Sequence, residues 1–538
     1  MTDFFGDQRT AVHVLRHQAR ENGDRVWITM DERDFTVRDM DRRSTKLAES
    51  LRRLGVGPGD PVLVMLPNGI EFVDTWLALA KRHAIQVPVN TAYHGAMLQH
   101  IVSDSGARRI VIHSDYVGHL VEAGGELAVQ LETMIVVGER PAAEIVSQVR
   151  SRSWKLLEYE GLLDPGACND AAQPGEPNYF DVASIMYTSG TTGASKGVMV
   201  THAHSYQYAA GDNALQLAPG DVYYAPLPLF HIAGQWAVVY NCLIRGARAV
   251  IKARFSLGDF WNDVEKYGVT TTFMLGAMGS LLHRTTEARR TTLAKVLMSP
   301  LIPEYREFCE KFGVRVTTSY ASTEVNGVLA TDLDPPNHQT CGRVRADKFE
   351  VRLVDERDEE VAIGEVGELV VRPRLPWICM VGYWGRPAET AAAWRNGWLH
   401  SGDLLRRDAD GYYYFADRLK DSIRRRGENI SSVEVENIIN TISGVIESAV
   451  VPVASEFTEQ EVLACVVLSA GACSTEAELH AEMVSRLPKF MVPRYIRLVA
   501  EIPKTPTGKP QKFKLRNEVD VSQLWDSDPR QGARRKLQ

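Results

Sequence analysis

The sequence of 538 residues has few of the features that mark membrane, disulfide-rich or nucleic-acid-binding proteins. Its seven cysteines are scattered, odd in number and never spaced as Cys-x-x-Cys, which argues against a disulfide framework and a zinc site. No apolar run approaches the length of a membrane span, and the first residues lack the pattern of a signal peptide. The net charge of −7 gives no support for general nucleic-acid binding. We therefore expect a cytoplasmic protein with no membrane span and no nucleic-acid partner.

The composition that remains is that of a globular protein, with 44% hydrophobic and 24% charged residues. The length allows about two to four domains. Helical and strand patterns alternate early in the chain, which is typical of α/β layers with parallel strands. The expected elements are residues 11–22, 61–66, 69–80, 85–89, 109–113 and 133–137. A second α/β series runs from residue 247 to residue 318.

The pattern changes after residue 341, where hydrophobic residues recur with period two and Gly, Asp and Glu turns separate them. That spacing predicts antiparallel strands, so we expect a small antiparallel β-barrel part attached to the α/β layers. A compact α+β pattern follows residue 418. We expect a large N-terminal domain over residues 1–419 and a small C-terminal α+β domain over residues 420–526. The polar and basic residues 527–538 predict a disordered tail.

Residues 187–199 are the most informative stretch, with the sequence Tyr-Thr-Ser-Gly-Thr-Thr-Gly-Ala-Ser-Lys-Gly-Val-Met. Glycines let the backbone turn its N–H groups inward, hydroxyls add donors, and Lys196 supplies a full positive charge. This combination suits an anion with several oxygens, such as the phosphates of a nucleotide. It is not the Walker pattern, because no Gly-Lys-Ser/Thr occurs. Taken alone, the run would also fit a surface loop rich in Gly, Ser and Thr.

Further short runs combine turn residues with chemically active side chains. They are residues 226–234 with His231, residues 319–324 with Tyr320 and Glu324, residues 398–403 with Asp403, residues 415–429, and residues 503–509 with Lys509. In this order they resemble the adenylate-forming enzyme superfamily, which includes acyl-CoA synthetases, adenylation domains of peptide synthetases and luciferases. The resemblance covers nearly the whole chain. Residues 422–431, Ser-Ile-Arg-Arg-Arg-Gly-Glu-Asn-Ile-Ser, are most similar to medium-chain and carnitine-type CoA ligases.

The resemblance implies an ATP-dependent reaction in two steps. A carboxylate attacks the α-phosphorus of ATP to form an acyl-adenylate and pyrophosphate, and a thiol, usually that of coenzyme A, then displaces AMP. Such chemistry depends on positioning and charge neutralisation more than on covalent help. The implied cofactors are ATP, Mg²⁺ and coenzyme A, and the implied partner is a small-molecule acid.

Similarity also implies a role for each matching residue. The phosphate-binding residues would be Thr188, Ser189, Gly190, Thr191, Thr192 and Lys196. The residues around adenine and the α-phosphate would be Ser299, Tyr320, Ala321, Ser322 and Thr323, with Tyr320 stacked on the base. Glu324 would bind Mg²⁺, and Asp403 would accept hydrogen bonds from the ribose with help from Arg418.

The catalytic residues implied by the resemblance are Lys509, Lys196, Thr323, Glu324 and His231. Lys509 would bridge the substrate carboxylate and the α-phosphate, opposing the negative charge of the transition state. The C-terminal domain would rotate about a hinge at Lys420, presenting Lys509 in one position and residues 424–429 beside the thiol channel in the other.

Four departures from the family pattern bear on the substrate. Ser195 stands where proline usually precedes the loop lysine, and Ala321 replaces a glycine. Residues 298–300 are Met-Ser-Pro in a substrate wall that usually carries two glycines, so we expect a narrowed or rerouted pocket. The junction at residues 82–84, Arg-His-Ala, is a structural change only. We therefore expect an unusual, small substrate, with short or aromatic acids outcompeting palmitate.

Several alternatives remain open on sequence grounds. The acceptor is coenzyme A, a carrier-protein thiol, or an aryl amine that receives ATP-activated nitrite in a diazotisation. A nucleotide-binding scaffold without catalysis is the non-enzyme alternative, and the oligomeric state is monomer or homodimer. His231 either gates the carboxylate pocket or is a core histidine. The arginines at residues 424–426 would also fit a solvated face.

Overall fold

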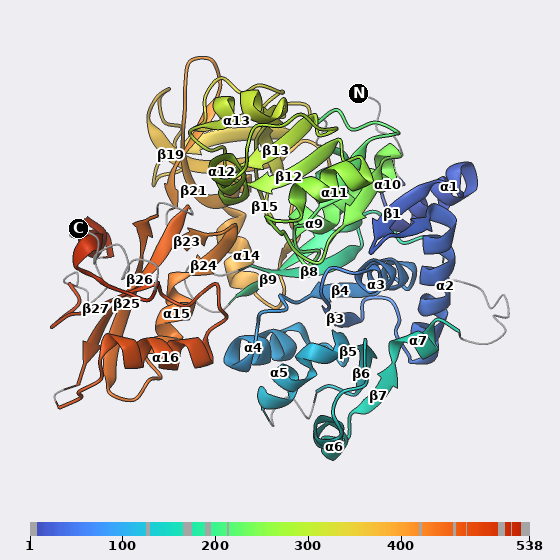
Figure 1. The fold of residues 1–538 in the computed structure, drawn as a ribbon, viewed down its shortest axis with the longest axis horizontal. Helices are drawn as coiled ribbons and strands as arrows, with labels where there is room; N and C mark the ends of the chain where they lie inside the picture. Colours follow the sequence, from blue (N-terminus) through green and yellow to red (C-terminus); the bar gives the residue numbers. More distant parts are fainter. Residues whose placement is uncertain are drawn as a thin grey trace.

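The computed structural model describes residues 8–124, 130–164, 175–188, 195–211, 215–418, 422–455, 459–469, 471–503, 512–517 and 519–528. A large body carries most of the chain, and a smaller C-terminal body lies beside it, orange to red in Figure 1. Within the described residues, no helix has both the length and the apolar character needed to cross a bilayer.

The first large sheet is mainly parallel and has the order β20-β9-β8-β4-β3-β5-β6-β7. Its strands are β3 (Pro61–Met65), β4 (Ile85–Pro88), β5 (Arg109–His113), β6 (Thr133–Val137), β7 (Lys155–Glu158), β8 (Val182–Thr188), β9 (Lys196–Thr201) and β20 (Gly382–Tyr383). The pairs from β8 to β7 are parallel, whereas β9 and β20 add two antiparallel strands at one edge. The hydrophobic runs expected to be parallel strands are therefore confirmed.

The second sheet has the order β14-β13-β12-β10-β11-β1-β2 and is parallel apart from the β1–β2 pair. Its strands are β1 (Val26–Met30), β2 (Arg33–Thr36), β10 (Val222–Ala225), β11 (Arg248–Ile251), β12 (Thr271–Leu275), β13 (Lys295–Ser299) and β14 (Arg315–Thr317). The first strand of the chain thus joins the second sheet, and one continuous hydrophobic core packs between and around the two sheets.

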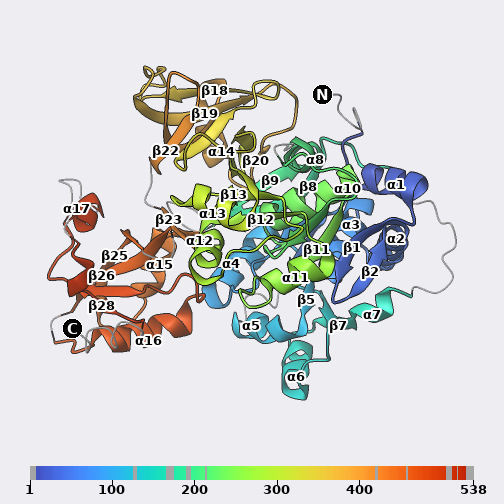
Figure 2. The same cartoon turned by 45° about the horizontal axis from the view of Figure 1, so that its top comes forward.

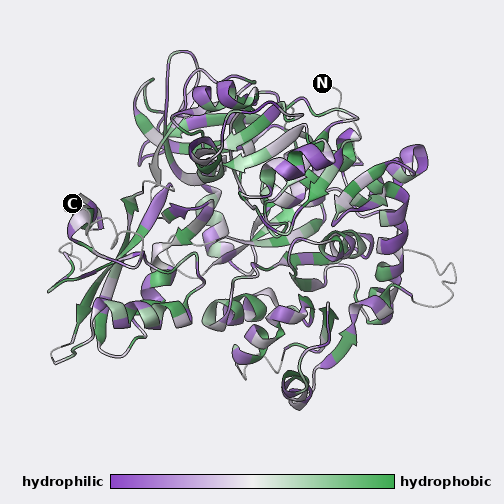
Figure 3. Cartoon of the chain, in the orientation of Figure 1, coloured by the Kyte–Doolittle hydropathy of each residue, from purple (hydrophilic) through white to green (hydrophobic). Residues whose placement is uncertain are grey.

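Helices cover these sheets, and Figure 3 shows hydrophilic and hydrophobic residues mixed along many of them. The longer ones are α1 (Ala11–Asn22), α2 (Val37–Arg53), α3 (Ile70–Lys81), α4 (Gly95–Ser105), α6 (Ala143–Ser151), α8 (His202–Gly211), α11 (Phe260–Tyr267), α12 (Gly276–Thr285) and α13 (Tyr305–Phe312). Short helices are α5 (Val117–Glu122), α7 (Tyr159–Leu162), α9 (Ile232–Gly234), α10 (Asn241–Arg245) and α14 (Pro387–Ala393). Residues Gln235–Tyr240 form a π-helix. Thr36 and Asp39 form a capping box at the start of α2, which satisfies its first N–H groups.

The third sheet is antiparallel, with the order β15-β16-β17-β22-β21-β19-β18. Its strands are β15 (Ser319–Ser322), β16 (Asn326–Ala330), β17 (Thr340–Val344), β18 (Phe349–Val354), β19 (Val366–Pro373), β21 (Leu399–Arg407) and β22 (Tyr413–Arg418). Figure 2 shows β18, β19 and β22 together at the top of the large body. The part expected as a small barrel is an open sheet within the described residues, because its edge strands β15 and β18 do not pair with each other.

The C-terminal body contains a hairpin and a separate four-stranded sheet of order β25-β26-β27-β28. Its strands are β23 (Ser422–Arg425), β24 (Glu428–Ser431), β25 (Val445–Ala454), β26 (Gln460–Leu468), β27 (Tyr495–Leu498) and β28 (Trp525–Asp526), and its helices are α15 (Ser432–Ile439), α16 (Glu476–Arg486) and α17 (Lys512–Asn517). The α+β pattern expected here is confirmed. The boundary at Lys420 lies outside the described residues. Of the tail expected over residues 527–538, only Ser527 and Asp528 are described, and the Ser527 N–H donates to the Arg494 carbonyl at 3.0 Å, so these limits stay predictions.

Candidate active site

The phosphate-type run lies between two antiparallel strands at the edge of the first sheet. β8 ends at Thr188 and β9 begins at Lys196, and these two residues are register partners. The loop therefore leaves and re-enters the sheet at neighbouring points. Ser189, Gly190, Thr191 and Thr192 lie outside the described residues.

A carboxylate from another sheet reaches this point. The Thr188 hydroxyl donates a hydrogen bond to Glu324 Oε1 at 3.3 Å, and Glu324 lies in the turn between β15 and β16. Met380 donates its backbone N–H to the Glu324 carbonyl at 2.9 Å, which fixes the backbone of that turn. The expected metal ligand and the first residue of the phosphate run are therefore direct neighbours.

Tyr383 on β20 links the expected charges of the site. The Lys196 Nζ lies 4.9 Å from the centroid of its ring, and its hydroxyl hydrogen-bonds the Glu324 carboxylate. Burial and the nearby Glu324 carboxylate raise the pKa of Tyr383 well above its usual range, so the phenol stays neutral and donates its proton. One aromatic side chain thus holds a cation on its face and an anion at its tip.

The expected nucleoside-binding residues also meet across two strands of the third sheet. The Tyr320 hydroxyl on β15 donates to Asp403 Oδ2 on β21 at 2.6 Å, and Asp403 is only 4% exposed. Asp403 is the register partner of Arg418 on β22, whose backbone is described. An aromatic ring and a buried carboxylate therefore lie side by side, as recognition of a base and its sugar requires.

Two further expected residues lie between these clusters. Ser299 ends β13, and its hydroxyl donates to the Ser319 carbonyl at 2.9 Å, so the second and third sheets join at this point. Ser322 accepts a hydrogen bond from the Val325 N–H at 3.3 Å, which closes the turn holding Thr323 and Glu324. Ala321, Ser322 and Thr323 are half-buried, and this part of the turn remains accessible to a ligand.

One residue expected in the wall of the acid pocket, Met298, lies in the hydrophobic core instead. Met298 is fully buried on β13, and a Cβ placed on Gly279 of α12 would lie 2.7 Å from Met298 Cε. Because neighbouring residues of a strand point to opposite faces, Met298 packs between sheet and helix while Ser299 takes the other face. The bulk of Met298 therefore fills the core against α12.

The C-terminal hairpin of β23 and β24 lies against His231 and the start of α12. His231 Nε2 lies 3.1 Å from Glu428 Oε2 of β24. Gly427 precedes it with φ of +81°, and a Cβ there would lie 2.1 Å from Leu275 Cδ1. His231 is thus partly exposed and in contact with Glu428 rather than a satisfied core residue.

A second contact joins the C-terminal body to the end of the phosphate run. The carboxyl of Glu434 on α15 is hydrogen-bonded to the backbone N–H of Ser195, and burial raises the pKa of Glu434 to about 8. The Ser195 carbonyl accepts a hydrogen bond from His100 Nε2 at 2.8 Å. Nearby, the rings of Tyr93 and Phe490 lie 6.4 Å apart between the two bodies.

Sequence reasoning missed Tyr383, Glu428 and Glu434 as members of this region. Tyr383 sits in an ordinary turn-rich run, and its partners are far away along the chain. Glu428 lies inside a quoted motif, but its ionic partner comes from the other body. Only the pairing of β20 with β9 and the docking of the hairpin bring these groups together. Lys509 and Lys420 lie outside the described residues, so their roles stay predictions.

Comparison with known proteins agrees with this geometry. Residues 15–384 match the family model described as AMP-binding enzyme, and residues 434–509 match the AMP-binding enzyme C-terminal domain. The chain belongs to the AMP-binding enzyme family. The expected relationship to the adenylate-forming superfamily is therefore confirmed.

The chain is similar to several named proteins over almost its whole length. It is 31% identical over 501 residues to the crotonobetaine/carnitine–CoA ligase of Salmonella agona (strain SL483), covering 90% of this chain and 93% of that protein. The o-succinylbenzoate CoA synthetase of Bacillus subtilis has the same fold, with a TM-score of 0.80 at 22% identity over 94% of this chain and 98% of that one. The amide bond synthetase of Marinactinospora thermotolerans gives a TM-score of 0.79 at 23% identity over 94% and 99%.

Proposed function

We propose that this chain activates a small or aromatic carboxylic acid with ATP and transfers the acyl group to the thiol of coenzyme A. The first step releases pyrophosphate and leaves an acyl-adenylate, and the second releases AMP. Family membership and the likeness to a crotonobetaine/carnitine–CoA ligase support this AMP-forming acid–thiol ligase activity. The single observation that carries the proposal is the meeting of Thr188, Lys196 and Glu324 around Tyr383.

This cluster provides the charge distribution that a metal-bound triphosphate requires. Lys196 supplies a positive charge, Thr188 a hydroxyl, and Glu324 a carboxylate for a cation. The described residues contain no group of three or more metal-binding side chains. A single carboxylate fits Mg²⁺, because this ion takes one or two protein carboxylates and completes its shell with phosphate oxygens and water. When bound, Mg²⁺ would neutralise phosphate charge and so ease departure of pyrophosphate.

The nucleoside would be held by the pair Tyr320 and Asp403. The Tyr320 ring would stack on adenine, and the buried Asp403 carboxylate would accept hydrogen bonds from the ribose hydroxyls. Thr323 would contact the α-phosphate between the two clusters. Lys509 would approach from the C-terminal body and oppose the charge that develops at the α-phosphorus.

The contact between His231 and Glu428 bears on the second step. The hairpin carrying residues 424–429 contacts the large body at His231 and Leu275, and we propose that this orientation serves thiol transfer. In that orientation Glu428 would hold His231, and we expect this contact to keep the imidazole away from the path of the acyl group. Rotation of the C-terminal body about Lys420 would break this pair and bring Lys509 inward for adenylation.

A half-reaction assay tests the proposal. ATP–pyrophosphate exchange is measured with a panel of short, aromatic and long-chain acids, with Lys509→Ala as the negative control. We expect exchange with short or aromatic acids and little with palmitate, and coenzyme A should then consume the adenylate. Robust palmitate turnover would refute the substrate class, and a wild-type protein with no exchange would favour a non-catalytic scaffold.

The acceptor is tested separately on preformed adenylate. Coenzyme A, a carrier protein with its pantetheine arm, and an amine are offered in parallel, and nitrite with an aryl amine forms one further condition. We expect coenzyme A to release AMP fastest. Faster release with any other acceptor would leave adenylation intact and replace the second step.

A further inference from the structure

A buried carboxylate lies directly behind Asp403, on the neighbouring strand β19. Glu368 is 7% exposed and accepts three hydrogen bonds, from His400 Nδ1 at 2.8 Å, Arg395 Nη2 at 3.0 Å and the Gly402 backbone N–H at 3.0 Å. Burial alone would raise the pKa of Glu368, but the bonds from His400 and Gly402 and the charge of Arg395 hold it below its usual range. Glu368 is therefore an ionised carboxylate that accepts three hydrogen bonds.

Two of these donors lie on the strand that carries Asp403. His400 and Gly402 are both on β21, and Gly402 has φ of +75°, a left-handed conformation that other residues adopt only with strain. The Asp403 N–H donates to Ser401 Oγ at 3.1 Å, which continues the same turn. Glu368 thus fixes the backbone immediately before Asp403 and sets the direction of that side chain.

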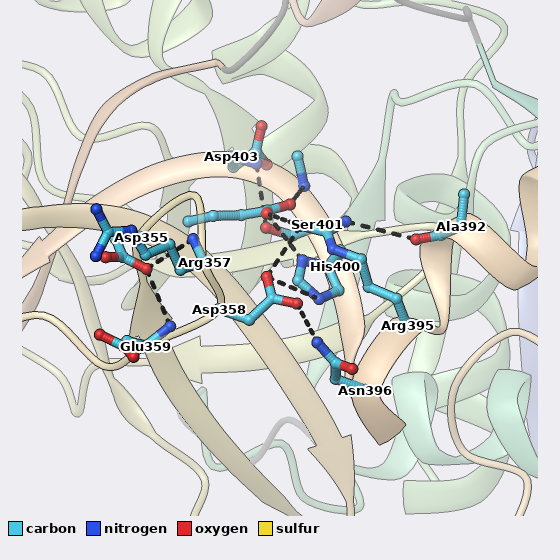
Figure 4. A network of polar contacts seen from close by, with 12 residues as sticks. Asp355, Arg357, Asp358, Glu359, Ala392, Arg395, Asn396, His400, Ser401 and Asp403 are labelled. Atoms are coloured by element: carbon cyan, nitrogen blue, oxygen red, sulfur yellow. Dashed lines mark hydrogen bonds and ion pairs between the residues drawn. The ribbon is translucent and has the colours of Figure 1, made fainter.

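An outer carboxylate completes the support, as Figure 4 shows around His400. Asp358 lies 3.8 Å from His400 Nε2 and accepts hydrogen bonds from Arg395 and Asn396. The His400 side chain is only 4% exposed, so it is held from two sides and cannot turn away. The network leads from the surface of the third sheet inward to Gly402.

The hydrogen bond from Tyr320 shows what this support does for the site. Asp403 receives the Tyr320 hydroxyl on Oδ2 at 2.6 Å. The geometry of the Asp403 carboxylate depends on the bulged segment of β21 around Gly402, whose N–H is held by Glu368. A displacement of that segment by a fraction of an ångström would disturb an acceptor that must meet two ribose hydroxyls at hydrogen-bond distance.

We propose that Glu368, acting through His400 and the Gly402 N–H, is a positioning residue that aims Asp403 and thereby sets discrimination for the ribose hydroxyls of the nucleotide. The inference rests on the proposed role of Asp403 in holding ribose. A purely structural role for the network would change stability alone. A positioning role changes the preference for ribose over deoxyribose.

The test compares ATP with 2′-deoxy-ATP in the full-length enzyme. The ratio of their kcat/KM values in pyrophosphate exchange is internal to each variant, so partly unfolded protein does not affect it. Since a hydrogen bond to a charged acceptor is worth on the order of a tenfold preference, we expect the wild type to favour ATP by about that factor. Calorimetric binding of AMP and 2′-deoxy-AMP gives a second readout that needs no turnover.

Three substitutions examine the network. Glu368→Gln replaces one acceptor oxygen with an NH₂ group that faces other donors, so the side chain can no longer accept all three hydrogen bonds. We expect the preference for ATP over 2′-deoxy-ATP to fall to about two-fold. His400→Leu removes one donor and should act in the same direction. His400→Asn places an amide N–H near the position of Nδ1 and should restore most of the preference.

Two controls separate the possible outcomes. Glu350→Gln removes a carboxylate from the same sheet, where Glu350 pairs with the outward arginines Arg352 and Arg372 at 3.6 Å, and it should keep the wild-type ratio. Asp403→Ala should abolish the preference. If Asp403→Ala retains it, the proposed role of Asp403 is wrong. If Asp403→Ala loses it while Glu368→Gln keeps it, the positioning inference alone is overturned.

Discussion

The backbone N–H of Ser195, at the end of the phosphate run, is hydrogen-bonded to the buried carboxyl of Glu434 in the C-terminal body. The resemblance to the adenylate-forming superfamily leads us to expect proline at this position, and proline has no N–H to donate. The replacement by serine therefore adds a contact between the two bodies, in the orientation where the C-terminal hairpin also meets His231. Ser195, which departs from the family pattern, thus has a hydrogen-bond acceptor in Glu434 on the C-terminal body.

Restoring proline should weaken this orientation. In Ser195→Pro the Glu434 carboxyl loses a donor, so we expect thiol transfer from preformed adenylate to slow by about tenfold, the value of one lost hydrogen bond to a buried acceptor. Pyrophosphate exchange should change little. Ser195→Ala keeps the N–H and is the matched control. Equal slowing in both variants would show that the hydroxyl, and not the N–H, matters.

The ionisation of Glu434 should make docking of the two bodies dependent on pH. Its pKa is raised from 4.5 to about 8 by burial, so the docked state binds the proton more tightly than the separated state. Docking is then strongest below about pH 4.5 and weakens as pH rises towards about 8, where the buried carboxylate ionises. Energy transfer between one dye on each body measures this directly.

Glu434→Gln should remove that dependence, because the amide is neutral at every pH. We expect a flat docking curve in this variant and a sloping one in the wild type. Glu356→Gln changes an exposed glutamate far along the chain and should keep the slope. A wild-type curve that strengthens between pH 5 and about 8 would contradict the prediction.

The hairpin glycine should be needed for the second step alone. Gly427→Ala introduces a Cβ about 2.1 Å from Leu275 Cδ1, so the hairpin must withdraw, and we expect thiol transfer to fall by about tenfold or more from overpacking. Pyrophosphate exchange should be retained. Gly411 has the same φ of +81° with open space around it, so Gly411→Ala controls for backbone strain. Adding Leu275→Ala to Gly427→Ala should recover part of the transfer rate.

Tyr383 should affect the requirement for Mg²⁺. Tyr383→Phe keeps the ring beneath Lys196 but removes the hydroxyl that holds Glu324, so the half-saturating Mg²⁺ concentration in pyrophosphate exchange should rise by about three- to tenfold. Tyr267 makes a similar ring contact with Lys252 at 5.6 Å, remote from this cluster, so Tyr267→Phe is the matched control. An unchanged Mg²⁺ requirement in Tyr383→Phe would contradict the proposal that Tyr383 positions Glu324 for binding Mg²⁺.

Most elements of the fold could be predicted from local pattern. The helix expected at residues 11–22 is α1 over Ala11–Asn22, and the strand expected at residues 109–113 is β5 over Arg109–His113, because burial on one face imposes the period. The open form of the third sheet could not be predicted. Closure of a sheet depends on whether its two edge strands meet, and alternation along each strand carries no information on that.

The candidate site, like the fold, was predicted in part from local sequence and in part could not be. The glycines, hydroxyls and lysine of residues 187–199 indicated an anion site from the sequence alone, whereas the roles of Tyr320, Glu324 and Asp403 were implied by the family resemblance and stay predictions. The meeting of Lys196 and Glu324 around Tyr383, the support of Asp403 by Glu368 and the contact of Ser195 with Glu434 join residues from different sheets or different bodies. Neighbouring residues in the sequence indicate where turns and charges lie. The distances between residues far apart in the sequence are set by strand pairing and packing. The sequence alone therefore established the phosphate-type character of residues 187–199, and only the folded structure showed which remote residues contact and position these groups.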